Sequence, residues 1–205
     1  MKLPKLRELK EAIRALIKGP YTSEFPRVAH KPHKNFRGQP KFNQDKCVGC
    51  LACEEVCPVG AIDHIDITDD GGIPRRIMVH YTDTCIFCGQ CEAVCIAEHE
   101  GIKLSDEWEL SFFDRKNESS ETIEKELQLC EICGRSIACK DHLKWIADKL
   151  GELTYSSPTL YLSRLKSLGI VDENIVSVLK SEGRSDRVKI LCASCRRKTT
   201  LTTEE

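Results

Sequence analysis

Thirteen cysteines stand out in this chain of 205 residues, and eight of them form two runs with the same spacing. The first run is Cys47, Cys50, Cys53 and Cys57, and the second is Cys85, Cys88, Cys91 and Cys95. Three closely spaced thiolates followed by a fourth form the C-x2-C-x2-C-x3-C pattern that holds [4Fe–4S] clusters, and in two-cluster proteins the fourth cysteine binds the other cluster. Each run is therefore a candidate iron–sulfur site.

The spacing also assigns ligands to two clusters. Cluster one is expected on Cys47, Cys50, Cys53 and Cys95, and cluster two on Cys85, Cys88, Cys91 and Cys57. Because the fourth ligands cross over, both clusters would be held at a fixed short separation, which suits electron transfer. Pro58 follows Cys57 as the pattern expects, whereas Ile96 follows Cys95. Paired zinc sites and clusters of mixed type are the alternatives.

The two runs form an internal repeat with an offset of 38 residues. The offset predicts two copies of one supersecondary unit related by a pseudo-twofold axis. Gly49 and Gly89 lie inside the loops, where a missing Cβ would let backbone amides approach sulfur. Between the runs, alternating hydrophobic residues on both sides of Asp70-Gly71-Gly72 predict two short strands joined by a turn.

A second cysteine pattern occupies the C-terminal part of the chain. Its two C-x-x-C knuckles are Cys130 with Cys133 and Cys192 with Cys195. Four thiolates of this kind typically close around one structural Zn²⁺ ion, so one zinc site is expected here. The intervening 58 residues exceed the usual spacing of a zinc ribbon, and a third iron site or free thiols are the alternatives. Cys139 has no matching partner and is expected to be a small buried residue.

The net charge of −1 hides a strong asymmetry along the chain. Residues 1–46 carry twelve Lys and Arg against four acids, whereas residues 47–205 carry nineteen against twenty-eight. Residues 1–19 place hydrophobic side chains at steps of three and four, from Leu3 to Ile17, and predict a basic amphipathic helix that ends at Gly19-Pro20. This helix would lie on a membrane surface or in a groove of another subunit.

The remaining segments complete a predicted α+β fold. Residues 20–42 contain four prolines and predict an extended docking arm, in which His30 and His33 are expected to be surface or interface contacts. Residues 43–104 form the expected bacterial-type dicluster ferredoxin core. Residues 105–129 are charged and are interpreted as a linker, and residues 130–205 as a helical zinc-knuckle domain.

Several classes of function are excluded on the sequence. The chain contains no phosphate-binding loop, dinucleotide fingerprint or nucleophile elbow, so we expect no substrate site of its own and leave open whether it is itself an enzyme. The acidic C-terminal part lacks a basic stripe with interleaved aromatic residues, which argues against nucleic-acid binding. The N-terminus carries no signal peptide pattern, and no hydrophobic run reaches the length needed to cross a bilayer.

Beyond these motifs, the sequence resembles a known family. The stretches NFRGQPKFNQDKCVGCLACEEVCPVGAI, CIFCGQCEAVC and IKLSDEWELSFF are similar to the dicluster ferredoxin-like subunit of the complex I superfamily. The cysteine-rich segments LCEICGRSIACKDHLKWIA and LCASCRRKTTL are similar to the tail of the iron–sulfur subunit of formate hydrogenlyase-type and membrane-bound [NiFe] hydrogenase complexes. The resemblance covers about residues 34–145 and 189–201.

The resemblance implies a subunit that carries electrons through two [4Fe–4S] clusters. The expected partners are a small subunit with a proximal cluster and a catalytic large subunit, in a complex attached peripherally to the cytoplasmic side of the cell membrane. The hydrogenase or formate hydrogenlyase type is preferred. The alternatives are a sulfane-sulfur-reducing complex, an NADH or F420H2 dehydrogenase, and a free soluble ferredoxin carrier.

Overall fold

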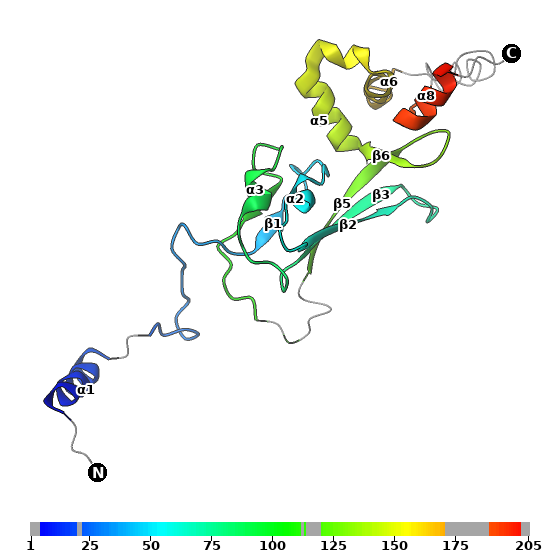
Figure 1. Ribbon diagram of the computed structural model, residues 1–205. Helices are drawn as coiled ribbons and strands as arrows, with labels where there is room; N and C mark the ends of the chain where they lie inside the picture. Colours follow the sequence, from blue (N-terminus) through cyan, green and yellow to red (C-terminus); the bar gives the residue numbers. More distant parts are fainter. Residues whose placement is uncertain (1–4, 20–21, 112, 114–119, 171–188, 202–205) are drawn as a thin grey trace. The chain divides into compact units, whose positions relative to one another are not determined.

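The computed structural model describes residues 5–19, 22–111, 113, 120–170 and 189–201. The chain divides into two units, residues 1–36 and residues 37–205. Most of the helices and strands are labelled in Figure 1. In chain order the elements are α1 (Leu6–Lys18), β1 (Pro40–Phe42), α2 (Ala52–Glu55), β2 (Ile62–Ile67), β3 (Arg75–Tyr81), α3 (Gln90–Ala93), β4 (Ile102–Leu104), β5 (Ser120–Leu129), β6 (Ser136–Cys139), α5 (Lys140–Leu150), the 3-10 helix η1 (Gly151–Ser156), α6 (Pro158–Ser167) and α8 (Ala193–Leu201).

The first unit contains α1 in the segment where the hydrophobic periodicity predicts a helix. At its start the backbone N–H of Lys5 donates a hydrogen bond of 2.9 Å to the Glu8 carboxylate. At its end Gly19 takes a positive φ of 78°, which a glycine adopts without strain. None of its side chains is buried. Leu3 and Pro20, which also belong to the predicted pattern, lie outside the described residues.

The second unit is built on a four-stranded antiparallel sheet in the order β2-β3-β5-β6. The hairpin of β2 and β3 is the one predicted around Asp70-Gly71-Gly72. In its register Ile62 lies opposite His80. Because β2 and β3 lie between the two cysteine runs in the sequence and β5 and β6 follow them, this sheet connects the cysteine runs to the C-terminal part of the chain.

The prediction of a linker over residues 105–129 is wrong for residues 120–129. These ten residues form β5, of which residues 120–126 pair with β3. Ile123, Lys125 and Leu127 are buried, and the residues between them are exposed. This alternation is a strand pattern, but the acidic residues on the exposed face made the segment read as a linker. Residues 114–119 of the predicted linker lie outside the described residues.

The boundary predicted at residue 42 also needs correction. β1 pairs with β4 in a second, two-stranded antiparallel sheet, and Pro40 is fully buried. The backbone N–H of Gly38 donates to the Ser105 carbonyl at 3.0 Å. Residues 37–42 thus belong to the second unit, because their backbone groups find partners in a segment about 60 residues further along the chain.

The C-terminal cysteine region does not begin a separate body at residue 130. β6 pairs with β5, so this region continues the four-stranded sheet. After β6 the chain forms α5, η1 and α6, and the Thr154 hydroxyl donates to the Ala147 carbonyl at 2.9 Å. Residues 171–188 and 202–205 of the predicted zinc-knuckle domain lie outside the described residues. Among the described residues, no helix is long and apolar enough to cross a membrane.

Candidate metal centres

The two cysteine runs adopt the same unusual backbone conformation. In the first run Gly49 and Leu51 have φ values of 70° and 67°, and in the second Phe87 and Gly89 have φ values of 53° and 80°. These four residues occupy equivalent positions under the 38-residue offset. A short helix follows each pair, α2 in the first run and α3 in the second. The left-handed residues therefore bend each loop so that its cysteines surround one common site.

Four cysteines line one hollow, which we call hollow one. Three of them, Cys47, Cys50 and Cys53, come from the first run, and the fourth is Cys95 from the second run. The rest of the lining is mainly apolar and includes Met78 from β3. This is the set of cysteines that the spacing assigns to cluster one.

A second hollow, hollow two, is lined by the complementary set of cysteines. They are Cys85, Cys88 and Cys91 from the second run and Cys57 from the first. The Sγ atom of Cys57 accepts a hydrogen bond of 3.2 Å from the backbone N–H of Ala61. Four thiols around an apolar hollow, with backbone amides directed at sulfur, form a donor set that fits a [4Fe–4S] cluster.

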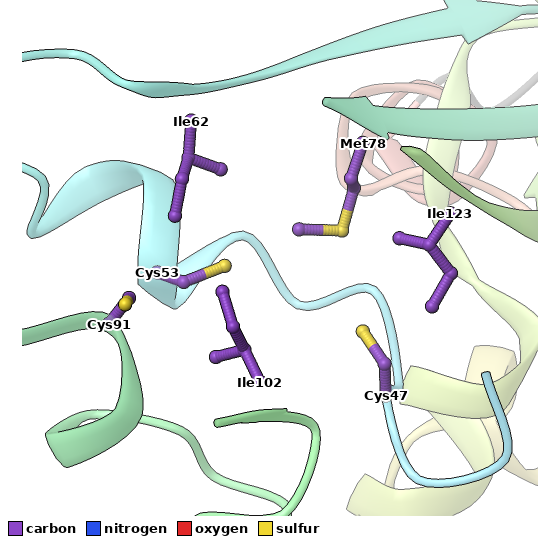
Figure 2. Packing of buried hydrophobic residues seen from close by; sticks show 7 residues of the cluster. All are labelled: Cys47, Cys53, Ile62, Met78, Cys91, Ile102 and Ile123. Carbon is purple, nitrogen blue, oxygen red and sulfur yellow. The ribbon is translucent and has the colours of Figure 1, made fainter. Parts of the chain in front are cut away.

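One hydrophobic core joins the two hollows (Figure 2). Cys53 of the first run and Cys91 of the second lie in this core together with Ile62 and Ile102. Burial raises the pKa of the Cys53 thiol, and it raises that of Cys91 to about 11. Without metal these thiols are protonated at neutral pH, so binding of a cluster releases protons.

Two buried cations beside hollow one were missed by the sequence reasoning. The Arg76 guanidinium donates to both carboxylate oxygens of Asp66, at 2.7 and 2.8 Å, and to the Gly49 carbonyl at 3.1 Å. The ammonium group of Lys125 on β5 donates to the Gln44 carbonyl and lies 3.1 Å from the Asp141 carboxylate. No local motif marks these residues, because the loop, the hairpin and β5 meet only in the folded chain.

A histidine lines hollow two and was also missed. His80 on β3 is fully buried, and neither of its ring nitrogens has a hydrogen-bond partner among the described residues. Burial lowers the pKa of this imidazole. The repeat offset, which aligns His80 with Phe42, is the signal that could have drawn attention to it.

The four cysteines of the C-terminal knuckles come together in a third site. The Sγ atoms of Cys130, Cys133, Cys192 and Cys195 all lie within 4.8 Å of one another. The Sγ atoms of Cys133 and Cys192 are 3.8 Å apart. The first knuckle lies in the turn between β5 and β6, and the second lies at the start of α8. Hydrogen bonds from Arg135 lower the pKa of Cys133 to about 6, which favours the thiolate form that binds metal.

Cys139 lines neither hollow and is not part of the third site. It is fully buried at the end of β6, as the sequence analysis expected of a small core residue. A Cβ atom at Gly49 would lie 2.5 Å from the Cys139 Sγ atom. Contact with Cys139 is therefore one reason for a glycine at residue 49, and the backbone of Gly49 also hydrogen-bonds the Cys47 thiol, as the sequence analysis expected of an amide close to sulfur. His30 and His33 are exposed in the first unit.

Residues 40–63 match a protein family described as a 4Fe-4S binding domain. Formate hydrogenlyase subunit 6 of Escherichia coli is 34% identical over 134 residues, which cover 65% of this chain and 71% of the relative. NADH-quinone oxidoreductase subunit I 2 of Geobacter metallireducens is 28% identical over 57% of this chain and 92% of the relative.

The chain spans about half the length of another relative. NAD(P)H-quinone oxidoreductase subunit I of Gloeobacter violaceus is 30% identical over 47% of this chain and 46% of the relative. Among solved structures, a chain of the archaeal membrane-bound sulfane sulfur reductase is 24% identical with a TM-score of 0.39. That match covers 58% of this chain and 61% of the other.

Proposed function

Because the chain belongs to the family of 4Fe-4S ferredoxin-like subunits related to complex I, we propose that each of its two hollows holds one [4Fe–4S] cluster and that electrons pass between them. The role of an iron–sulfur electron-transfer subunit follows from the family. The ligand sets proposed are Cys47, Cys50, Cys53 and Cys95 for cluster one, and Cys85, Cys88, Cys91 and Cys57 for cluster two.

The observation that carries this proposal is the crossed composition of the two hollows. Each hollow takes three cysteines from one run and its fourth from the other, as tandem runs of this spacing require. When bound, each cluster supplies a site that accepts and releases one electron. The chain contributes the thiolates, and the core around Ile62 and Ile102 keeps water away from the path between the hollows.

The third site is proposed to hold a single ion, most readily Zn²⁺. A tetrahedral ion with bonds to sulfur of about 2.3 Å places the sulfur atoms about 3.8 Å apart, and the distance from Cys133 to Cys192 is 3.8 Å. A cubane cluster, whose four irons occupy alternate corners of a cube, needs its four thiolates farther apart than a single ion does. This ion would tie the turn after β5 to the start of α8.

We further propose that the chain works inside a membrane-bound oxidoreductase complex of the hydrogenase or formate hydrogenlyase type. The similarity to formate hydrogenlyase subunit 6, which extends over 65% of this chain, favours this type over a quinone oxidoreductase. The proposed partners are a small subunit with a proximal cluster and a catalytic large subunit. Peripheral attachment on the cytoplasmic side agrees with the exposed hydrophobic residues of α1, which include Leu6, Leu16 and Ile17.

Metal analysis and electron paramagnetic resonance (EPR) of the full chain, isolated without oxygen, test the cofactor proposal. About eight iron atoms and about one zinc ion per chain are expected. The variant Cys95→Ser should lose cluster one although residue 95 belongs to the second run, whereas the matched control Cys139→Ser should keep both clusters. Loss of cluster two alone in Cys95→Ser would refute the crossed ligand sets.

Purification of the tagged chain from native membranes tests the assignment to a complex. Recovery with a nickel-binding large subunit supports the hydrogenase type. A large subunit without nickel ligands would move the chain to a dehydrogenase or sulfur-reducing complex. Recovery of the chain alone from the soluble fraction would refute membership in a complex.

A further inference from the structure

His80 is a buried polar side chain with no hydrogen-bond partner in the part of the chain that the structure describes. Its ring lies in the wall of hollow two, and it is fully buried. Neither Nδ1 nor Nε2 has a hydrogen-bond partner among the described residues. A buried donor without an acceptor is costly and rare in folded proteins, so an orphaned imidazole beside a cofactor site points to a partner within that site.

The internal repeat supplies a comparison within the same chain. The 38-residue offset aligns His80 with Phe42, and each of the two residues pairs with an isoleucine on the neighbouring strand. His80 lies opposite Ile62 in the pairing of β2 with β3, and Phe42 lies opposite Ile102 in the pairing of β1 with β4. Phe42 lines hollow one, just as His80 lines hollow two.

The two equivalent positions therefore differ in their chemistry. An aromatic ring fills the wall of hollow one without any hydrogen-bonding group, so packing alone does not require a histidine at this position. The four cysteines of hollow two already supply a full set of cluster ligands, which leaves no coordination position for an imidazole.

We propose that His80 donates an N–H hydrogen bond to a sulfur atom of the cluster in hollow two and thereby raises the reduction potential of that cluster. This inference rests on the proposed function, since it needs a cluster bound by Cys57, Cys85, Cys88 and Cys91. A hydrogen bond to sulfur stabilises the added negative charge of the reduced cluster, and hydrogen bonds of this kind are among the factors that set cluster potentials. Phe42 gives cluster one no such bond.

The test is an EPR-monitored redox titration of the full chain and of two reciprocal variants. His80→Phe introduces the residue type of the first repeat at the equivalent position of the second, and it should lower the midpoint potential of the cluster in hollow two only. Phe42→His introduces the residue type of the second repeat at the equivalent position of the first, and it should raise the midpoint potential of the cluster in hollow one. Equal potentials in wild type and His80→Phe, with both clusters present, would overturn the proposal.

A spectroscopic measurement on the wild-type chain covers the case in which His80→Phe fails to assemble cluster two. The chain has six histidines, which can be labelled with ¹⁵N. Pulsed EPR of the reduced chain should detect ¹⁵N coupled to a cluster, and absence of any such coupling would overturn the proposal. A coupling that persists in a His80→Phe chain holding both clusters would assign it to another histidine and also overturn it.

These results are separate from the test of the proposed function. A chain without iron–sulfur clusters would refute the proposed function itself, which the iron content and the EPR signal report directly. Two intact clusters without a histidine coupling or a shift in potential would refute only the role of His80.

Discussion

Replacing Gly49 by alanine should lower the stability of the loop around hollow one. The loss should be much larger than the loss that the same substitution causes in an open turn. Gly49 has a φ of 70°, and a left-handed backbone costs a residue with a Cβ about 1–2 kcal/mol. The added methyl group would also lie 2.5 Å from the Cys139 Sγ atom and 3.2 Å from its Cβ atom. Overpacking of this kind costs typically about 1–3 kcal/mol. The total expected loss of stability is about 2–5 kcal/mol.

Gly71 provides the matched control for this substitution. Its φ of 74° is almost the same, but a Cβ atom there would meet no atom within 4 Å. Gly71→Ala should therefore carry only the backbone cost, and the two variants should differ by the overpacking cost of about 1–3 kcal/mol. The double variant Gly49→Ala with Cys139→Ala removes the clashing sulfur and should recover part of that difference.

The assay is the rate at which a chelator removes iron from the clusters in mild denaturant without oxygen. A difference of about 1–3 kcal/mol corresponds to a rate ratio of at most roughly 5- to 150-fold between the two variants. Iron should leave the cluster in hollow one first in Gly49→Ala. Equal rates for Gly49→Ala and Gly71→Ala would show that contact with Cys139 does not constrain this loop.

Three further substitutions test other contacts. Cys133→Ala should prevent the third site from binding its ion and leave the iron content unchanged. Elemental analysis checks this against the control Cys139→Ala, and a loss of iron would indicate an iron site instead. Arg76→Met leaves the Asp66 carboxylate without its bidentate partner and should lower the free energy of unfolding, measured by chemical denaturation, by up to about 3 kcal/mol. Adding Asp66→Asn should restore part of this loss. Lys125→Met removes a buried positive charge close to Cys47 and should lower the midpoint potential of cluster one alone. An unchanged potential in a redox titration would contradict this electrostatic effect.

Much of the iron–sulfur chemistry can be predicted from local spacing. The loop from Cys47 to Cys57 places three thiols around one hollow because its left-handed residues and the short α2 are determined within eleven residues. The hairpin of β2 and β3 was also predictable, since alternating hydrophobic residues around a glycine turn specify it locally. The knuckle motifs indicated the four cysteines of the third site, although the convergence of residues about 60 positions apart became visible only in the fold.

The tertiary structure decided the surroundings of these cysteines. The segment of β5 looked like a charged linker, because its acidic residues on the exposed face obscured the buried Ile123 and Leu127. The pairing of β5 with β3 brings the Lys125 ammonium to the loop of cluster one, and β6 brings Cys139 against Gly49. Spacing within a motif determines which atoms can bind a metal, because covalent geometry limits the reach of a short loop. The charges and donors around the metal come from strands distant in the sequence, and only their packing brings them together.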